Sequence, residues 1–272
     1  MASGAKVNLF DAAADCLACT DVARKIEATR ATAAAFSSGA IVIDAAIPPP
    51  APIGVPGRPL RPQLVSPRKL AQRGLGSAEG RAALVHAVAH IEFNAINLAW
   101  DAVYRFRDMP DDYYRDWVQV ADDEARHHML LVARLAELGH TYGDFDAHDG
   151  LWDMAVRTAD SCLARMALVP RVLEARGLDV TPGMIARLRA VGDEATVAIL
   201  ETILREEVAH VAAGSCWFAW CCARDGVDSA TTFHRLLEQH MRGSLRGPFN
   251  VDARLRAGFS AAELARLGEI AA

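Results

Sequence analysis

The sequence predicts an all-α protein, and two observations indicate this class. Alanine-rich runs are frequent, β-branched clusters are few and there are only four tyrosines, a composition that favours helices over strands. From about residue 77 onward, apolar residues recur at spacings of three, four and seven, which is the period of amphipathic helices. With 272 residues, of which 52% are hydrophobic, the chain can bury one large core or two smaller ones.

Four segments are expected along the chain. Residues 1–36 form an N-terminal helical appendage. In residues 37–75, eight of the twelve prolines fall between Pro48 and Pro67, which excludes a helix and predicts an extended linker packed on or near the main domain. Residues 76–226 form a four-helix bundle, and residues 227–272 form a C-terminal helical extension.

The individual helices are bounded by capping and breaking residues. Ser77 begins the first long helix, Pro110 with Asp111 begins the second, and Gly139 and Gly177 end the second and third. A loop at 179–183 and a short helix are expected before the fourth. The predicted helices span 8–15, 20–36, 77–106, 111–138, 151–176, 193–224 and 229–241, and a last short helix starts near 260, after an irregular tail.

The fourth long helix carries the first sign of chemistry. Glu207 and His210 are three residues apart and lie within an apolar stripe rather than on the solvated face. A buried carboxylate and a buried imidazole are costly unless something compensates them, and a metal ion is one such compensation.

The other three long helices carry matching residues. Glu92 lies among small apolar residues, and Glu124 and His127 repeat the Glu-x-x-His spacing. The distances along the chain also match. Glu92 precedes Glu124 by 32 residues, and Glu174 precedes Glu207 by 33. Two helical hairpins that each carry half a site would leave this pattern. The predicted metal ligands are Glu92, Glu124, His127, Glu174, Glu207 and His210.

The recurrence of the motif argues against coincidence. The 13 glutamates and nine histidines predict about 0.4 chance Glu-x-x-His matches, and there are three. The third, Glu137 with His140, straddles Gly139 at a helix end and is interpreted as fortuitous. Four carboxylates and two imidazoles suit two iron ions, and manganese or a mixed pair is also compatible. The alternative is a structural network in which these residues pair with one another or with Arg126 and Arg205.

The order of these residues is similar to the ferritin-like di-iron carboxylate superfamily. The runs HIEFNAINLAWD, DDEARHH, YGDFDAHDGLW, REEVAHV and GPFNVDARLRAGF resemble the uncharacterised ferritin-like family called domain of unknown function 455, over roughly residues 75 to 265. A distant relative in the superfamily is a tRNA-modifying monooxygenase that hydroxylates a prenylated adenosine. The resemblance implies a four-helix bundle, a dinuclear metal centre held by the same six residues, and O₂ chemistry.

Other residues surround the predicted ligands. His86, His90 and His128 are candidates for hydrogen-bonding to a ligand or substrate, with a second metal site or simple helix contact as alternatives. Pro170, one turn before Glu174, is expected to kink the third helix. The pair Cys16 and Cys19 is interpreted as packing rather than as a redox or zinc motif.

Net charge and segment hydropathy limit the partners. A net charge of −5 argues against a general affinity for nucleic acid. The arginines between Arg235 and Arg256 could bind a phosphate-bearing substrate or RNA, but a surface patch that pairs with the protein's own acidic loops is the favoured interpretation. No apolar run is long enough to span a bilayer and no signal peptide is evident, so a cytoplasmic protein without a membrane partner is expected.

The predicted function is therefore that of a cytoplasmic di-iron oxidoreductase, an oxidase or monooxygenase acting on a small organic or nucleotide-like substrate with O₂. An electron donor and a homo-oligomer are compatible with this prediction. Two alternatives stay open: an iron-binding or ferroxidase-type protein without an organic substrate, and a metal-free helical interaction module.

Overall fold

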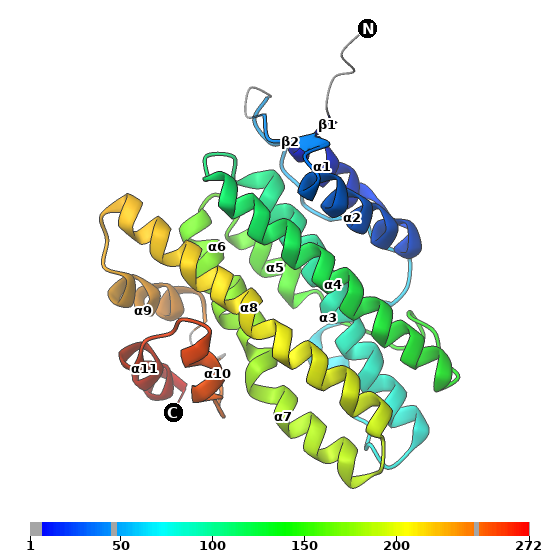
Figure 1. The fold of residues 1–272 in the computed structure, drawn as a ribbon. Helices are drawn as coiled ribbons and strands as arrows, with labels where there is room; N and C mark the ends of the chain where they lie inside the picture. Colours follow the sequence, from blue (N-terminus) through cyan, green and yellow to red (C-terminus); the bar gives the residue numbers. More distant parts are fainter. Residues whose placement is uncertain (1–6, 45–47, 242–244, 272) are drawn as a thin grey trace, which may run out of the picture. The chain divides into compact units, whose positions relative to one another are not determined.

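The computed structural model describes residues 7–44, 48–241 and 245–271 and confirms the all-α class (Figure 1). Among these residues the only sheet is a parallel pair of two-residue strands, β1 (Val7–Asn8) and β2 (Ile41–Val42). The chain divides into two compact units, Met1–Val156 and Arg157–Ala272. This division differs from the four segments predicted above, which stay a prediction.

In the first unit, two N-terminal helices pack on the longer helices α3 (Ala78–Arg105) and α4 (Asp111–Glu137). They are α1 (Leu9–Ala18) and α2 (Val22–Ser37), close to the predicted bounds. Asp21 caps α2 by accepting a hydrogen bond from the Arg24 amide. Lys25 in α2 is fully buried and donates hydrogen bonds to the carbonyl oxygens of Cys16 and Leu17 and to Oδ1 of Asn97.

The proline-rich segment has no α-helix in its described part, as expected, and contains one short 3₁₀ turn, η1 (Pro67–Lys69). Hydrogen bonds tie it to the first unit. The Ala51 amide donates to the Tyr104 hydroxyl at 2.8 Å, the Trp152 indole donates to the Gly54 carbonyl at 2.9 Å, and the Gly57 amide donates to the Leu17 carbonyl at 2.6 Å. The segment therefore packs on its own unit rather than extending away as a free linker.

The two long helices of the first unit match their predicted bounds. They are α3 (Ala78–Arg105), capped by the Ser77 side chain, and α4 (Asp111–Glu137), after which Gly139 takes a positive φ of 78°. Within the described chain, α3 is the one helix long and apolar enough to cross a membrane, but 72% of its most apolar stretch is buried. That burial is what the core helix of a soluble protein shows.

The prediction of one helix from 151 to 176, which crosses from the first unit into the second, is wrong. The structure has α5 (Gly150–Arg157), which ends where the second unit begins, then α6 (Cys162–Leu168), a π-helix η2 (Val169–Glu174) and α7 (Ala175–Ala190). Ser161 begins a new helix because its hydroxyl caps the Ala164 amide. Pro170 lies inside η2, so the distortion expected at this proline takes the form of a π-helix.

The predicted stop at Gly177 and the loop at 179–183 are also wrong, because α7 continues through both. Pro182 lacks the amide proton that would bond to the Leu178 carbonyl four residues earlier. The Asn250 side chain donates to that carbonyl at 3.0 Å instead. Asn250, which lies 72 positions after Leu178 in the sequence, thus makes a proline possible inside this helix.

The remaining helices of the second unit are α8 (Glu194–Asp225), α9 (Ser229–His240), α10 (Val251–Arg256) and α11 (Ala261–Ala271). Helices α8, α9 and α11 agree with prediction. Helix α10 was expected to be irregular, yet Asn250 caps it by accepting from the Ala253 amide. Helix α9 packs on α6, α8 and α11, whereas α10 packs on α7 and α8 (Figure 1).

Candidate metal centre

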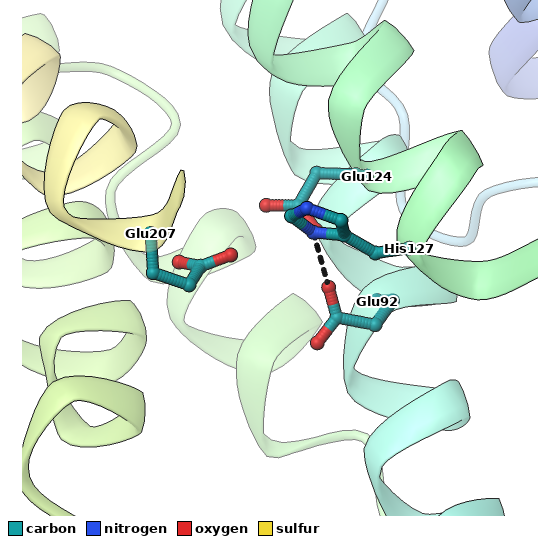
Figure 2. Close-up of side chains that lie close together, drawn as sticks. All are labelled: Glu92, Glu124, His127 and Glu207. Atoms are coloured by element: carbon teal, nitrogen blue, oxygen red, sulfur yellow. Dashed lines mark hydrogen bonds and ion pairs between the residues drawn. The ribbon is translucent and has the colours of Figure 1, made fainter. Parts of the chain in front are cut away.

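Three of the predicted ligands come together in the first unit. Glu92 extends from α3, and Glu124 and His127 extend from α4 one turn apart; all three are buried. His127 Nδ1 lies 3.2 Å from Glu92 Oε2 and 3.6 Å from Glu124 Oε2. One ligand atom from each residue lies within 4.8 Å of the others, and Figure 2 shows the three side chains pointing toward one another.

The electrostatics of this group are unusual for a helical core. Burial lowers the pKa of His127, but hydrogen bonds and charge from Glu124 and Glu92 outweigh it and raise this pKa to about 11. His127 is therefore an imidazolium in the metal-free protein. One cation between two buried carboxylates compensates half of their charge, and a divalent metal ion that replaced this proton would compensate all of it.

The donor set fits a metal ion. Carboxylate oxygen and imidazole nitrogen are ligands of iron, manganese and zinc. With metal–ligand bonds of roughly 2.0 to 2.2 Å, neighbouring ligand atoms on one ion lie about 3 to 4 Å apart, as the His127 contacts do. Glu92, Glu124 and His127 of the first unit, and Glu207 of the second, are thus buried residues that could hold a metal ion.

The second unit carries a comparable group. Glu207, labelled in Figure 2, and His210 lie one turn apart on α8 and are buried, and His210 Nδ1 is 3.2 Å from Glu207 Oε1. Glu174 is also buried, at the end of η2. Helix η2 packs on α6, α7 and α8 within this unit. The roles of Glu174 and His210 as metal ligands stay predictions.

The third Glu-x-x-His match is different. Glu137 is exposed and pairs with Arg134 at 2.7 Å, and His140 Nδ1 lies 3.4 Å from Asp144. These contacts support its interpretation as a fortuitous match at a helix end.

The three further histidines have partners away from Glu92. His86 Nε2 accepts from the Gly143 amide at 2.9 Å, His90 Nδ1 lies 2.8 Å from the Tyr142 hydroxyl, and His128 Nδ1 donates to the Ala89 carbonyl at 2.9 Å. Burial lowers the pKa of each of these histidines to about 4, so all three are neutral at pH 7. Their predicted part in holding a ligand or substrate stays a prediction.

Tyr142 is the residue of this region that sequence reasoning missed. Its ring stacks on His86 and meets His128 edge-on, and burial raises the pKa of its hydroxyl. It lies in an irregular segment between α4 and α5, where helical periodicity gives no signal.

One of the arginines suggested as a phosphate-binding patch lies in the interior rather than on the surface. Arg254 is buried and bound to Asp179 at 2.7 Å. Arg242 lies outside the described residues.

The fold and this group of residues define a class: an all-α protein with buried carboxylate and histidine side chains that could hold a metal ion. Within that class, the chain belongs to the family described as "Protein of unknown function (DUF455)", whose model matches residues 18–265. It is also 44% identical over 219 residues to an "Uncharacterized protein" of Haemophilus influenzae (strain ATCC 51907 / DSM 11121 / KW20 / Rd), covering 78% of this chain and 76% of the relative. No solved structure matches the chain.

Proposed function

We propose that this protein is a dinuclear metal carboxylate oxidoreductase with a ferritin-like core, and that it uses iron and O₂ to oxidise a small organic or nucleotide-like substrate. The observation that carries the proposal is the buried group of Glu92, Glu124 and His127. Two carboxylates taken out of water need a compensating cation, and their ligand atoms are spaced as a metal requires.

The residues of the second unit favour a centre with two ions rather than one. Glu174, Glu207 and His210 repeat the residue types and the spacing of the first group, and all three are buried. The four carboxylates of the two groups would together neutralise two divalent cations. Manganese or a mixed pair suits the same donors.

Each residue type has a defined task in this centre. The carboxylates Glu92, Glu124, Glu174 and Glu207 would hold the ions. His127 and His210, as neutral imidazoles, would complete the donor set, and the apolar surroundings would keep bulk water away. When bound, two iron ions supply electrons for the reduction of O₂.

Two other functions make different predictions. An iron-binding or ferroxidase-type protein would oxidise Fe(II) without an organic substrate, and a metal-free interaction module would bind no ion. A cytoplasmic location, an electron donor, a homo-oligomer and RNA as a less favoured partner belong to the proposal as well.

The test is anaerobic loading of the full chain with Fe(II), followed by exposure to O₂ and by absorption and Mössbauer spectroscopy. About two irons per chain and their conversion to Fe(III) are the expected result. Glu124→Gln should lose bound iron, whereas Glu137→Gln, in the exposed third match, should load as the wild type does. A wild-type chain that takes up no transition metal would refute the proposal and favour the interaction module.

A further inference from the structure

The π-helix η2, which ends at Glu174, carries a buried arginine. Arg171 is 2% exposed, and its guanidinium carbon lies 4.7, 4.2 and 4.4 Å from the ring centroids of Phe218, Phe233 and Phe259. Glu263 accepts a hydrogen bond from Arg171 Nη2 at 2.7 Å. An arginine three residues before a predicted metal ligand is thus held by the C-terminal helices of its own unit.

The segment Asn250–Glu263, called the C-terminal clamp below, makes a second set of contacts with η2 and α7. Arg254 donates two hydrogen bonds to Asp179, at 2.9 and 2.7 Å, and its Nη1 lies 3.4 Å from the Arg171 carbonyl oxygen. Asn250 donates its backbone amide to Asp179 and its side-chain amide to the Leu178 carbonyl. The clamp therefore supplies hydrogen bonds that the distorted helix does not make by itself.

On its other side, η2 is pressed against α8. A Cβ atom built on Gly214 would lie 2.4 Å from Cβ and Cγ of Pro170, so the two backbones approach more closely than any other residue at 214 would allow. Gly214 follows His210 by four residues, and Pro170 precedes Glu174 by four. This contact lies one helical turn from the predicted ligands on both elements.

The energetics indicate a geometric role for the buried ion pair. A buried pair such as Arg171 with Glu263 contributes little net stability compared with apolar residues of similar size, because both charges lose their hydration. Nε and Nη1 of Arg171 have no hydrogen-bond partner among the described residues, which adds to that cost. A π-helix is rare and persists where its surroundings hold it.

We infer that the C-terminal clamp holds η2 in its π-helical conformation and thereby sets the position of Glu174 relative to Glu207 and His210. Glu263 and Arg254 act as positioning residues, through Arg171 and Asp179. The inference rests on the proposed function insofar as Glu174 is a metal ligand, whereas the clamping of η2 does not depend on any metal.

The main variant is Glu263→Gln in the full chain, which keeps the side-chain shape and removes the charge. Its matched control is Glu201→Gln, which breaks the exposed pair with Arg189 in the same unit. Hydrogen exchange of the metal-free protein reads the conformation of η2 directly. Peptides covering 169–175 should exchange about tenfold faster in Glu263→Gln and at the wild-type rate in Glu201→Gln.

Co(II) binding, measured by titration and visible absorption, reports the geometry of the metal site without any catalytic turnover. Glu263→Gln should bind one Co(II) roughly 10- to 100-fold more weakly and with a changed absorption spectrum, and Glu201→Gln should match the wild type. Arg254→Lys keeps the positive charge but loses the bidentate contact with Asp179, so it should behave like Glu263→Gln. It is the variant to use if Glu263→Gln does not fold.

The outcomes separate the two ideas. Wild-type exchange at η2 and a wild-type Co(II) spectrum in both variants would overturn the positioning role, even if the wild-type chain binds two ions. No Co(II) uptake by the wild-type chain would refute the proposed centre, and with it the task assigned to Glu174, while the exchange rates would still decide whether the clamp holds η2.

Discussion

Lys25 provides a quantitative test of the packing of α1 and α2 on α3. Its side chain is 0% exposed, and Nζ donates to the carbonyl oxygens of Cys16 at 2.6 Å and Leu17 at 3.2 Å and to Asn97 Oδ1 at 2.7 Å. Burial lowers the pKa of this lysine from 10.5 to about 8. The charged form is therefore less favourable in the folded protein than in the unfolded chain.

The sign and size of the effect on stability follow from this pKa. Below pH 8 the lysine is protonated in both states, and above pH 10.5 it is neutral in both. Between these values the unfolded chain binds more protons, so the free energy of unfolding rises with pH. A fall from 10.5 to about 8 corresponds to a rise of about 3 kcal/mol across the window.

The assay compares urea unfolding of the wild type and Lys25→Met between pH 7 and 10.5. Methionine fills a similar volume without a charge, so the variant lacks this proton linkage. The difference between the two unfolding free energies should change by about 3 kcal/mol in favour of the wild type as the pH rises. Both proteins carry alanine in place of Cys16 and Cys19, because these two thiols interact with the Lys25 charge; the other cysteines and the tyrosines titrate in both proteins and cancel in the difference. A difference independent of pH would refute the reasoning.

Three further predictions concern single buried sites. Anaerobic Fe(II) at about 100 times its Kd should raise the unfolding free energy of the wild type by about 2.7 kcal/mol for each ion bound but not that of Glu124→Gln; an equal rise in both would exclude this residue as a ligand. Gly214→Ala should lower the unfolding free energy by about 2 kcal/mol in urea titrations, because the new methyl group meets Pro170; an unchanged value would show that η2 can move away freely. Asp101→Asn should lower it by about 3 kcal/mol, since Asp101 is fully buried and accepts three hydrogen bonds from Arg105; a loss below about 1 kcal/mol would mean that this pair behaves as a surface pair.

Helical periodicity was sufficient for α3, α4 and α8 and for the buried carboxylate–histidine group of the first unit. Residues three apart on a helix lie on one face, so Glu124 and His127 could be placed together from their spacing alone. Glu92 could be assigned to the buried side of its helix because small apolar residues surround it. The cap at Ser77 is local as well, since its side chain bonds to an amide three residues on.

Several expectations were wrong or incomplete because a distant residue decides the outcome. Gly177 and Pro182 are helix breakers by local rules, yet α7 contains both, and Asn250 supplies the bond that Pro182 cannot make. Arg254 was read as part of a basic tail, but Asp179 pairs with it in the interior.

By itself, the sequence determined the all-α class, the bounds of α3, α4 and α8 and the residue types of a buried carboxylate–histidine site, because these depend on periodicity and on the cost of burying charge. Only the tertiary structure decided that η2 is a π-helix and that Tyr142 lies among His86, His90 and His128. Those features arise from contacts between residues far apart in the chain, which no local spacing records.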